Sequence, residues 1–333
     1  DLDGVRVYYL KDIYDDECFV ANTISGLLEK ESLNLSIDQL YEDIQTAATD
    51  LSDKIGESFD VEQFLDERKE LYSGVLNRRI YVLTGSPGSG KSYELLKVIQ
   101  AFNNQSEVTR VLTLTGKAAL RLRKNEEGFG GINASTIDKF LAEADREADQ
   151  GATSITHNLV IDEASMVDLP KLARLLRVIN TSGGSFKRLI LVGDENQLPP
   201  IGFGKPFADI IDFLSLNRHK YTRNMICLDT NCRAELPSEY IEFAKSFSNS
   251  SKAPEDAQSA IVDEGSYFSG GLMLRYWRNR DELLTALDSS TQQLIDDAEE
   301  EVSDVSGLLG IASSGQKRPT SLSRFQILTP NRK

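Results

Sequence analysis

A glycine-rich loop between a short apolar run and a helical pattern constrains this chain more than any other feature. The loop reads Gly85-Ser86-Pro87-Gly88-Ser89-Gly90-Lys91-Ser92, and it follows the apolar residues 80–83. A strand, this loop and then a helix is the setting of a phosphate-binding loop. Glycines allow the positive φ angles that point successive N–H groups at a phosphate, and the start of the following helix attracts the same anion.

The loop predicts a nucleotide site with defined roles. Lys91 is expected to reach the β- and γ-phosphates, and Ser92 to bind a magnesium ion. The residues expected to contact the nucleotide are Gly85, Pro87, Gly88, Ser89, Gly90, Lys91 and Ser92. The alternative is a plain glycine-rich turn, which the strand before it and the helix after it argue against.

A pair of acidic residues follows a second apolar run. Residues 157–161 are typical of a buried strand, and Asp162 and Glu163 come directly after it. Ligands of open parallel sheets bind at this carboxyl edge. Asp162 is expected to hold magnesium through water, and Glu163 to orient and deprotonate the water that attacks the γ-phosphate. A solvated cap of the next helix is the alternative for both acids.

Composition limits the class of protein. The chain has 333 residues and 40% hydrophobic content, enough for two cores. Its three cysteines are too few for a disulfide framework, which predicts reduced thiols and a cytoplasmic protein. We expect no membrane segment, because no apolar run is long enough to span a bilayer. The first residue is not Met, so we expect a piece of a longer protein.

The net charge of −15 argues against a general affinity for nucleic acid. Acidic residues crowd into the N-terminal region and into residues 296–304, whereas Lys117, Arg121, Arg123 and Lys124 lie close together. Local basic clusters can still bind a phosphate backbone. The net charge therefore does not decide the partner.

The pattern of apolar residues predicts an α/β fold. Residues 1–78 have helical spacing and no glycine-rich loop, which predicts a helical N-terminal region. After residue 79, short strands alternate with helices, which indicates a parallel sheet with helices on both faces. The expected strands are Ile80 to Thr84, Val108 to Thr115, Asn158 to Asp162, Leu189 to Gly193 and Met225 to Asp229. Further along, residues 246–264 are expected to form a loop or linker, 272–294 a helix and 325–328 a final strand.

Two hydroxyl-rich corners precede helical patterns. In Thr113-Leu114-Thr115-Gly116-Lys117, a strand end runs into a helix start, where free N–H groups suit a nucleic-acid phosphate. The segment around Thr136 has the same character. An ordinary helix N-terminus with solvated lysines is an equal alternative for the first corner, and simple N-capping is the alternative for the second.

A third loop, residues 191–202, reads LVGDENQLPPIG. Here a strand ends in a glycine, and a stiff Leu-Pro-Pro turn follows the amide side chain of Gln197. An amide fixed in this way can bond the γ-phosphate or the attacking water and release it after hydrolysis. We therefore predict that Gln197 senses the γ-phosphate.

The ordered motifs GSPGSGKS, TLTGKAA, ASTIDKFL, VIDEASMVD, VGDENQLPPIGFGKPFADI and LDTNCRAE resemble the motor of superfamily 1 helicases. The resemblance covers about Ile80 to Glu235 and is specific to the RecD-like branch (superfamily 1B), which moves 5′ to 3′. It implies a RecA-like P-loop NTPase domain over residues 79–222 and part of a second RecA-like domain over 223–333. ATP and Mg²⁺ would bind between the two domains.

By the same resemblance, Arg233 would reach the γ-phosphate from the second domain, where it neutralises developing charge only when the cleft closes. Thr115, Lys117 and Thr136 match positions that contact the backbone of single-stranded DNA in this family.

The chain departs from the family at three places. Asp138 stands where relatives commonly have His, and an acid there would repel a phosphate. The Gln that reads adenine is expected near Glu67 or Arg68, and neither residue has its paired donor and acceptor. Residues 142–156 leave room for only a short hairpin where relatives insert a strand-separating pin. We expect the last two family motifs to follow Lys333.

The sequence therefore predicts an ATP-driven 5′-to-3′ DNA helicase or translocase acting on single-stranded DNA. Two alternatives stay open. One is a nucleotide-gated switch in a larger defence or repair assembly, with the acidic N-terminal region as the docking surface for partner proteins. The other is the same motor acting on RNA, since no residue pattern here reports on the 2′-hydroxyl.

Overall fold

The computed structural model describes residues 10–30, 32–33, 38–56, 59–124, 132–149, 155–180, 185–232, 267–269, 272–274 and 277–296. The chain forms two compact units, Asp1–Glu235 and Leu236–Lys333. The candidate site lies in the first unit.

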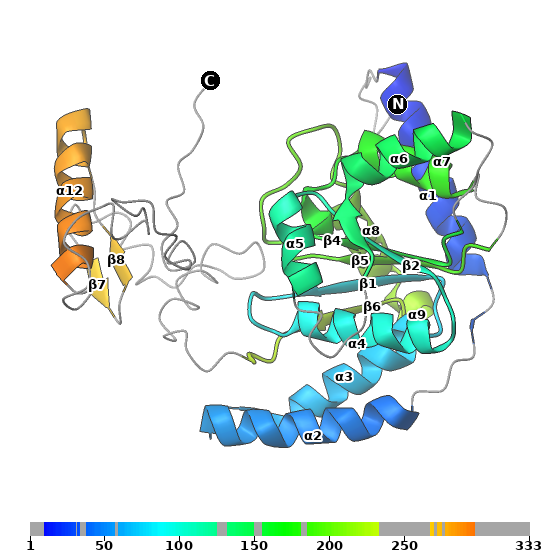
Figure 1. The fold of residues 1–333 in the computed structure, drawn as a ribbon, viewed down its shortest axis with the longest axis horizontal. Helices are drawn as coiled ribbons and strands as arrows, with labels where there is room; N and C mark the ends of the chain where they lie inside the picture. Colours follow the sequence, from blue (N-terminus) through cyan, green and yellow to red (C-terminus); the bar gives the residue numbers. More distant parts are fainter. Residues whose placement is uncertain are drawn as a thin grey trace, which may run out of the picture. The chain divides into compact units, whose positions relative to one another are not determined.

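A parallel sheet of six strands forms the centre of the first unit (Figure 1). Its strands are β1 (Ile80–Gly85), β2 (Thr109–Thr113), β3 (Ala134–Thr136), β4 (Asn158–Asp162), β5 (Arg188–Val192) and β6 (Met225–Leu228). Their order is β3-β2-β4-β5-β1-β6, and every neighbouring pair is parallel. This confirms the predicted α/β class of P-loop NTPases.

Successive residues of a strand point to opposite faces, so each strand feeds two cores. In β1, Ile80 and Val82 join one hydrophobic cluster, whereas Tyr81 and Leu83 join the other. Because parallel strands are buried on both faces, their sequences are continuous apolar runs and not alternating ones. Each fully buried aliphatic side chain contributes about 1.5–3 kcal/mol.

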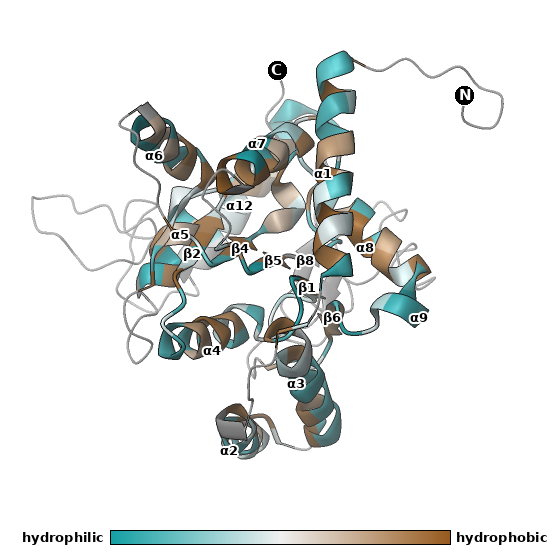
Figure 2. Cartoon of the chain, turned by 90° about the vertical axis from the view of Figure 1, so that its right-hand side faces the viewer, coloured by the Kyte–Doolittle hydropathy of each residue, from teal (hydrophilic) through white to brown (hydrophobic). Residues whose placement is uncertain are grey.

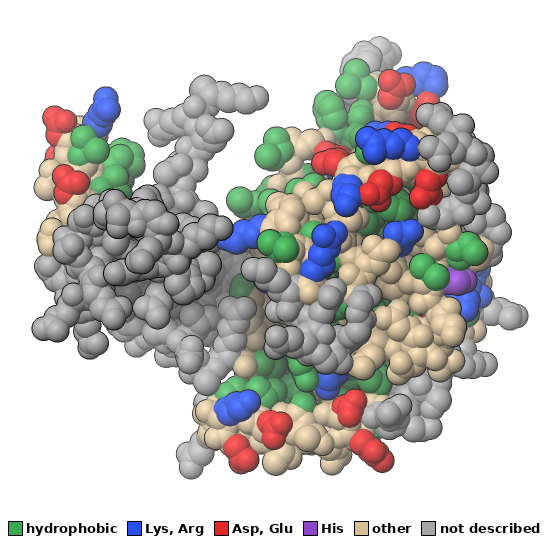
Figure 3. All heavy atoms as spheres, in the orientation of Figure 1, with side chains coloured by type: hydrophobic (Ala, Val, Ile, Leu, Met, Phe, Trp, Pro, Cys, Tyr) green, Lys and Arg blue, Asp and Glu red, His purple; other side chains and the backbone are tan. Residues whose placement is uncertain are grey.

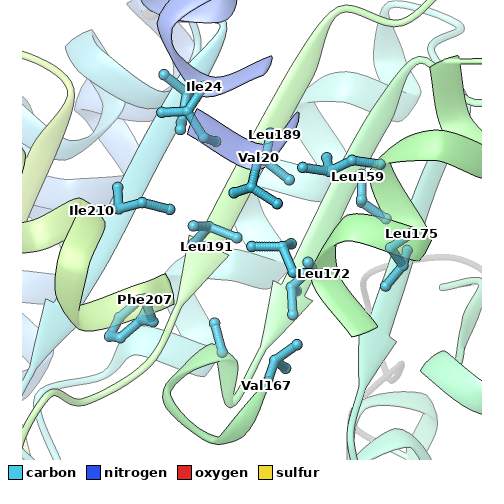
Figure 4. Packing of buried hydrophobic residues seen from close by; sticks show 14 of the residues in the cluster. Val20, Ile24, Leu159, Val167, Leu172, Leu175, Leu189, Leu191, Phe207 and Ile210 are labelled. Carbon is cyan, nitrogen blue, oxygen red and sulfur yellow. The ribbon is translucent and has the colours of Figure 1, made fainter. Parts of the chain in front are cut away.

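Helices cover both faces of the sheet (Figure 2). The helices of the first unit are α1 (Lys11–Glu29), α2 (Asp38–Ile55), α3 (Val61–Val75), α4 (Lys91–Asn104), α5 (Gly116–Lys124), α6 (Ile137–Asp149), α7 (Leu169–Asn180), α8 (Pro206–Leu216) and the short α9 (Arg218–Tyr221). Buried residues of α1, α6, α7 and α8 join the cluster on one face, and those of α2, α3, α4 and α5 join the other. Figure 4 shows the first cluster, in which Val20 and Ile24 of α1 lie among the β4 and β5 residues Leu159, Leu189 and Leu191.

The N-terminal helices therefore complete the two cores of the first unit. Helix α1 packs on α7, and α2 packs on α3, so the two helices lie on opposite faces of the sheet. Helix α3 begins where the side chain of Asp60 accepts a hydrogen bond of 2.9 Å from the Gln63 N–H. The predicted division at residue 78 has no counterpart in the compact units.

The second predicted division, between residues 222 and 223, also differs from the compact units. Strand β6 follows this point but pairs with β1, with Gly85 opposite Leu228, and the first unit runs on to Glu235. The described part of the second unit has an antiparallel pair, β7 (Tyr267–Ser269) and β8 (Leu272–Leu274), and the helix α12 (Arg280–Asp296).

One local prediction needs correction. The helix expected over 272–294 begins only at Arg280, because the apolar residues Leu272–Leu274 pair as a strand. In the segment 142–156, where relatives insert a pin, residues 142–149 continue α6 to Asp149. The predicted linker at 246–264, the predicted strand at 325–328 and the acidic stretch 297–304 lie outside the described residues.

Candidate functional site

The predicted site residues follow the carboxyl ends of neighbouring strands. The phosphate-binding loop leaves β1, Asp162 and Glu163 end β4, and the loop to Gln197 leaves β5. The order β4-β5-β1 places these three ends side by side. Parallel strands thus bring together residues that are more than a hundred positions apart in the sequence.

Glycines shape the phosphate-binding loop at its two ends. Gly90 has φ 86° just before α4, a left-handed conformation that leaves the helix N-terminus facing the loop. Gly85 has φ 147°, and a Cβ atom there would lie 2.3 Å from the Leu228 carbonyl oxygen. The close approach of β6 therefore requires a glycine at the first position of the loop.

Lys91 points back over the loop that it follows. Its Nζ donates hydrogen bonds to the carbonyl oxygens of Gly85 at 2.5 Å and Ser86 at 2.9 Å. The Ser89 hydroxyl also bonds the Ser86 carbonyl, at 2.9 Å. The ammonium is therefore already placed within the loop, where an entering phosphate can replace these carbonyl oxygens as its partner.

Asp162 and Glu163 have different environments at the end of β4. Asp162 is buried, and its Oδ1 accepts a 3.0 Å hydrogen bond from the Glu163 N–H, whereas its Oδ2 has no hydrogen-bond partner. Burial raises the pKa of Asp162, the nearby charge of Glu163 raises it further, and the Glu163 N–H, Arg121 and Lys91 oppose this shift. Glu163 has φ 57° and ψ 38°, a left-handed conformation rare for residues other than glycine, asparagine and aspartate. The two adjacent carboxylates therefore leave the strand in different directions.

A pocket of about 820 Å³ joins the predicted catalytic residues. Its lining includes Lys91, Ser92, Asp162, Glu163 and Gln197. Gln197 is exposed, and its N–H bonds the Asp194 carbonyl at 3.1 Å in the turn after β5. Three residues of the phosphate-binding loop also line this pocket, namely Pro87, Gly88 and Gly90. Every described residue that the sequence assigns to catalysis or metal binding thus lines one cavity.

Arg121 lines the same pocket, and the sequence analysis did not assign it to the site. It lies on α5, and its Nη2 is 3.4 Å from the Ser92 Oγ. Its charge also opposes the rise in the pKa of Asp162. The signal for it was present, because α5 starts at the carboxyl end of β2, beside β4.

The residues of the pocket fit a magnesium ion bound mainly through water and phosphate. Asp162 offers a buried carboxylate oxygen without a partner, and Ser92 offers a hydroxyl. Among the described residues, no three His, Cys, Asp or Glu side chains cluster as a complete metal site. Few protein ligands are typical of Mg²⁺ in nucleotide sites.

Arg68 supports the phosphate-binding loop from within the protein. It is fully buried, stacks 4.1 Å from the centre of the Phe64 ring and donates to Glu67, to Glu94 and to the Ser89 carbonyl. Glu67 meanwhile accepts hydrogen bonds from the N–H groups of Asp229 and Thr230. Neither residue near the expected adenine-reading position is free to contact a base.

Thr115 and Thr136 lie at neighbouring strand ends, since Thr113 pairs with Thr136 across β2 and β3. Each hydroxyl caps a helix: Thr115 Oγ1 accepts from the Ala118 N–H and Thr136 Oγ1 from the Lys139 N–H, both at 3.2 Å. Lys117 is exposed in the first turn of α5. The capping alternative is thus present at both corners, which does not prevent a phosphate from binding beside them. Figure 3 shows Lys and Arg side chains, with some acidic ones, over the region of α5, α6 and α7.

Asp138, the acid that departs from the family pattern, has a basic partner. Its carboxylate lies 2.9 Å from Nζ of Lys171 on α7. The pair offsets the repulsion that an isolated acid would exert on a phosphate. Arg233 and Lys124 lie outside the residues whose side chains the structure describes.

Residues 66–222 match the family described as an AAA domain. An uncharacterized protein of Methanocaldococcus jannaschii is 32% identical over 266 residues, which cover 73% of this chain and 22% of that protein. The RecBCD enzyme subunit RecD of Mycobacterium tuberculosis is 30% identical over 45% of this chain and 29% of its own length. The ATP-dependent RecD2 DNA helicase of Deinococcus radiodurans is 30% identical over 42% of this chain and 19% of its own length. The chain thus spans about a fifth to a third of the curated relatives that it matches.

No helix in the described part of the chain combines the length and the apolar character needed to span a bilayer.

Proposed function

We propose that this chain belongs to the RecD-like branch of the superfamily 1 helicases and is the ATP-hydrolysing motor part of a helicase or translocase. Its track is single-stranded DNA, and its direction is 5′ to 3′. The observation that carries the proposal is the single pocket lined by Lys91, Ser92, Asp162, Glu163 and Gln197.

The pocket supplies the groups that phosphoryl transfer to water needs. Lys91 binds the β- and γ-phosphates in place of the loop carbonyls that it now contacts. Glu163 orients the attacking water and accepts its proton, and Gln197 holds the γ-phosphate end. Magnesium, when bound by Ser92 and Asp162, neutralises charge on the phosphate oxygens.

Single-stranded DNA binds at the corner formed by the carboxyl ends of β2 and β3. Lys117 contacts a phosphate of the strand by charge, and the N-termini of α5 and α6 add their partial positive charge. Arg121 is four residues after Lys117 on α5, so both side chains share one side of the helix. A shift of α5 on strand binding therefore changes the position of Arg121 beside Ser92.

A nucleotide-gated switch within a larger assembly is the second candidate. The observation that favours it is the exposed acidic surface of α2, to which Glu42, Asp43, Asp50 and Asp53 contribute. A partner protein with a basic surface would bind there, and nucleotide state would control that contact. We place either machine in the cytoplasm, which agrees with the free state of all three cysteines.

The experiment that tests the proposal is steady-state ATP hydrolysis by the full-length protein, with Glu163→Gln as the blank. Single-stranded DNA, single-stranded RNA, duplex and no nucleic acid are compared. Strong stimulation by single-stranded DNA supports the motor, and preferential stimulation by RNA would mean that the motor acts on RNA instead of DNA. Basal hydrolysis that no nucleic acid stimulates refutes the motor and favours the switch.

A further inference from the structure

The nucleotide pocket extends beyond the phosphate-binding loop to a helix of the N-terminal region. Four residues of α2 line it, namely Ala47, Asp50, Leu51 and Lys54. Their spacing of three and four places them on one side of the helix. Helix α2 is fixed there because Ile44 and Ala48 are buried in the core that it shares with α3 and α4.

The opposite part of the pocket is occupied by the phosphate and catalytic groups. Lys91, Ser92, Asp162, Glu163 and Gln197 come from the carboxyl edge of the sheet. A triphosphate bound there leaves the α2 side of the same cavity for the rest of the nucleotide. The cavity volume of about 820 Å³ is within the range of pockets that enclose a ligand of this size.

The α2 side offers packing surfaces and no amide group. Tyr93, in the first turn of α4 directly after Ser92, has an exposed fraction of 48%, and Nζ of Lys97 lies 5.0 Å from the centre of its ring. This ring brings aromatic surface to the pocket, and Leu51 adds apolar surface. Among the described residues that line the pocket, Gln197 alone has an amide side chain, and it belongs to the catalytic side.

Arg68 does not take the place of such an amide. Its guanidinium has an exposed fraction of 0% and donates to Glu67, Glu94 and the Ser89 carbonyl. The hydroxyl of Tyr72 also donates to Glu94, which completes the buried cluster. Moving Arg68 towards a base would leave two buried carboxylates without their partner, which is costly.

We propose that α2 forms the nucleoside wall of this pocket, and that the base is held there by packing and stacking without a side-chain amide to read it. The inference rests on the proposed function and names what the site recognises: a nucleoside triphosphate, with little discrimination between ATP and GTP. Amide side chains discriminate bases by paired hydrogen bonds, and a stacking surface accepts any aromatic ring.

The test places a bulky side chain on the wall of the full-length protein. Asp50→Trp lies on the pocket side of α2, and the control Asp53→Trp lies on the same helix outside the pocket lining. Dissociation constants are measured for ATP, GTP and inorganic tripolyphosphate, which has no nucleoside. Circular dichroism and the unfolding midpoint of each variant verify that it folds.

We expect Asp50→Trp to raise the dissociation constants of ATP and GTP about tenfold or more and to change that of tripolyphosphate by less than about twofold. The control Asp53→Trp should change none of the three dissociation constants. ATP and GTP should bind the unmodified protein within about threefold of each other. If Asp50→Trp left the ATP affinity unchanged, or weakened the binding of ATP and tripolyphosphate equally, α2 would not be the nucleoside wall. A hundredfold preference of the unmodified protein for ATP over GTP would show that the base is not held by stacking alone. Failure of the proposed function is a different result, since hydrolysis that no nucleic acid stimulates would refute the motor and leave the binding of ATP and tripolyphosphate unchanged.

Discussion

The guanidinium of Arg68 donates a 2.6 Å hydrogen bond to the carbonyl oxygen of Ser89, so a buried side chain of α3 holds the phosphate-binding loop from the protein side. Because the same guanidinium pairs with Glu67 and Glu94, the loop is connected to two helices and to the segment after β6. The loop therefore keeps its shape before any nucleotide arrives.

Replacing Arg68 by Gln is expected to lower the free energy of unfolding by about 3–5 kcal/mol, because it leaves Glu67 and Glu94 buried without their cation. Urea unfolding of both proteins measures the change. Lys69→Gln is the matched control, since this neighbouring side chain is about half exposed and should cost less than about 0.5 kcal/mol. A loss as small for Arg68→Gln as for the control would contradict the supporting role.

Lys91→Ala and Glu163→Gln are expected to abolish hydrolysis for different reasons. Removal of Lys91 deletes a phosphate ligand, so ATP binding should weaken at least tenfold. Glu163→Gln keeps the phosphate ligands and removes only the group that accepts the proton of the water, so ATP should still bind and remain uncleaved. Equilibrium binding and single-turnover hydrolysis separate the two results. Equal loss of binding in both variants would refute the separate roles.

Asp162→Asn is expected to abolish magnesium-dependent hydrolysis and yet to stabilise the nucleotide-free fold by about 1 kcal/mol at neutral pH. The pKa of Asp162 is raised in the folded protein by burial and by Glu163, so its charged form is less favourable there than in the unfolded chain. The cost is present above the folded-state pKa and disappears as pH falls below the ordinary aspartate pKa, near 4.

Urea unfolding from pH 8 down to the lowest pH at which both proteins stay folded checks this sign. The advantage of the Asn variant should shrink as the solution becomes more acidic. An advantage that grows on acidification would mean that the folded protein favours the charged form of Asp162.

Lys117→Ala is expected to weaken the binding of single-stranded DNA and to reduce the dependence of log K on log salt by about one unit. The reason is the loss of one phosphate contact at the start of α5. Fluorescence anisotropy between low and moderate salt measures the slope. Lys220→Ala, which removes an equally exposed lysine from α9, serves as the control. Identical slopes for all three proteins would return Lys117 to an ordinary solvated side chain.

Local patterns in the sequence predicted the strands and the motifs that follow them. The central residues of β1, β4 and β5 are apolar, since helices bury both faces of these strands, and a glycine or an acid ends each strand or directly follows it. The three-residue strand β3 was taken for a turn, because so short a strand has no period to detect. The place of β6 beside β1 depends on pairing across more than a hundred residues, which no local pattern contains.

In the candidate site, too, some residues are predictable from local sequence patterns and others are placed only by tertiary contacts. Residues inside motifs were predictable because the chemistry of phosphate fixes their type and spacing. Arg121 and the pocket side of α2 belong to no motif, and only packing on the common core brings them to the pocket. Tertiary contacts of this kind are the part of a site that a single sequence does not contain.

The end of β6 gives the nucleotide site a mechanical meaning. Leu228 pairs with Gly85, and four residues later the Cys232 N–H bonds the Gly88 carbonyl at 3.0 Å. The last described residues of this segment, which ends at Cys232, are thus bonded to the phosphate-binding loop. A displacement of Gly88 by an entering or departing phosphate would therefore also displace the backbone of Cys232.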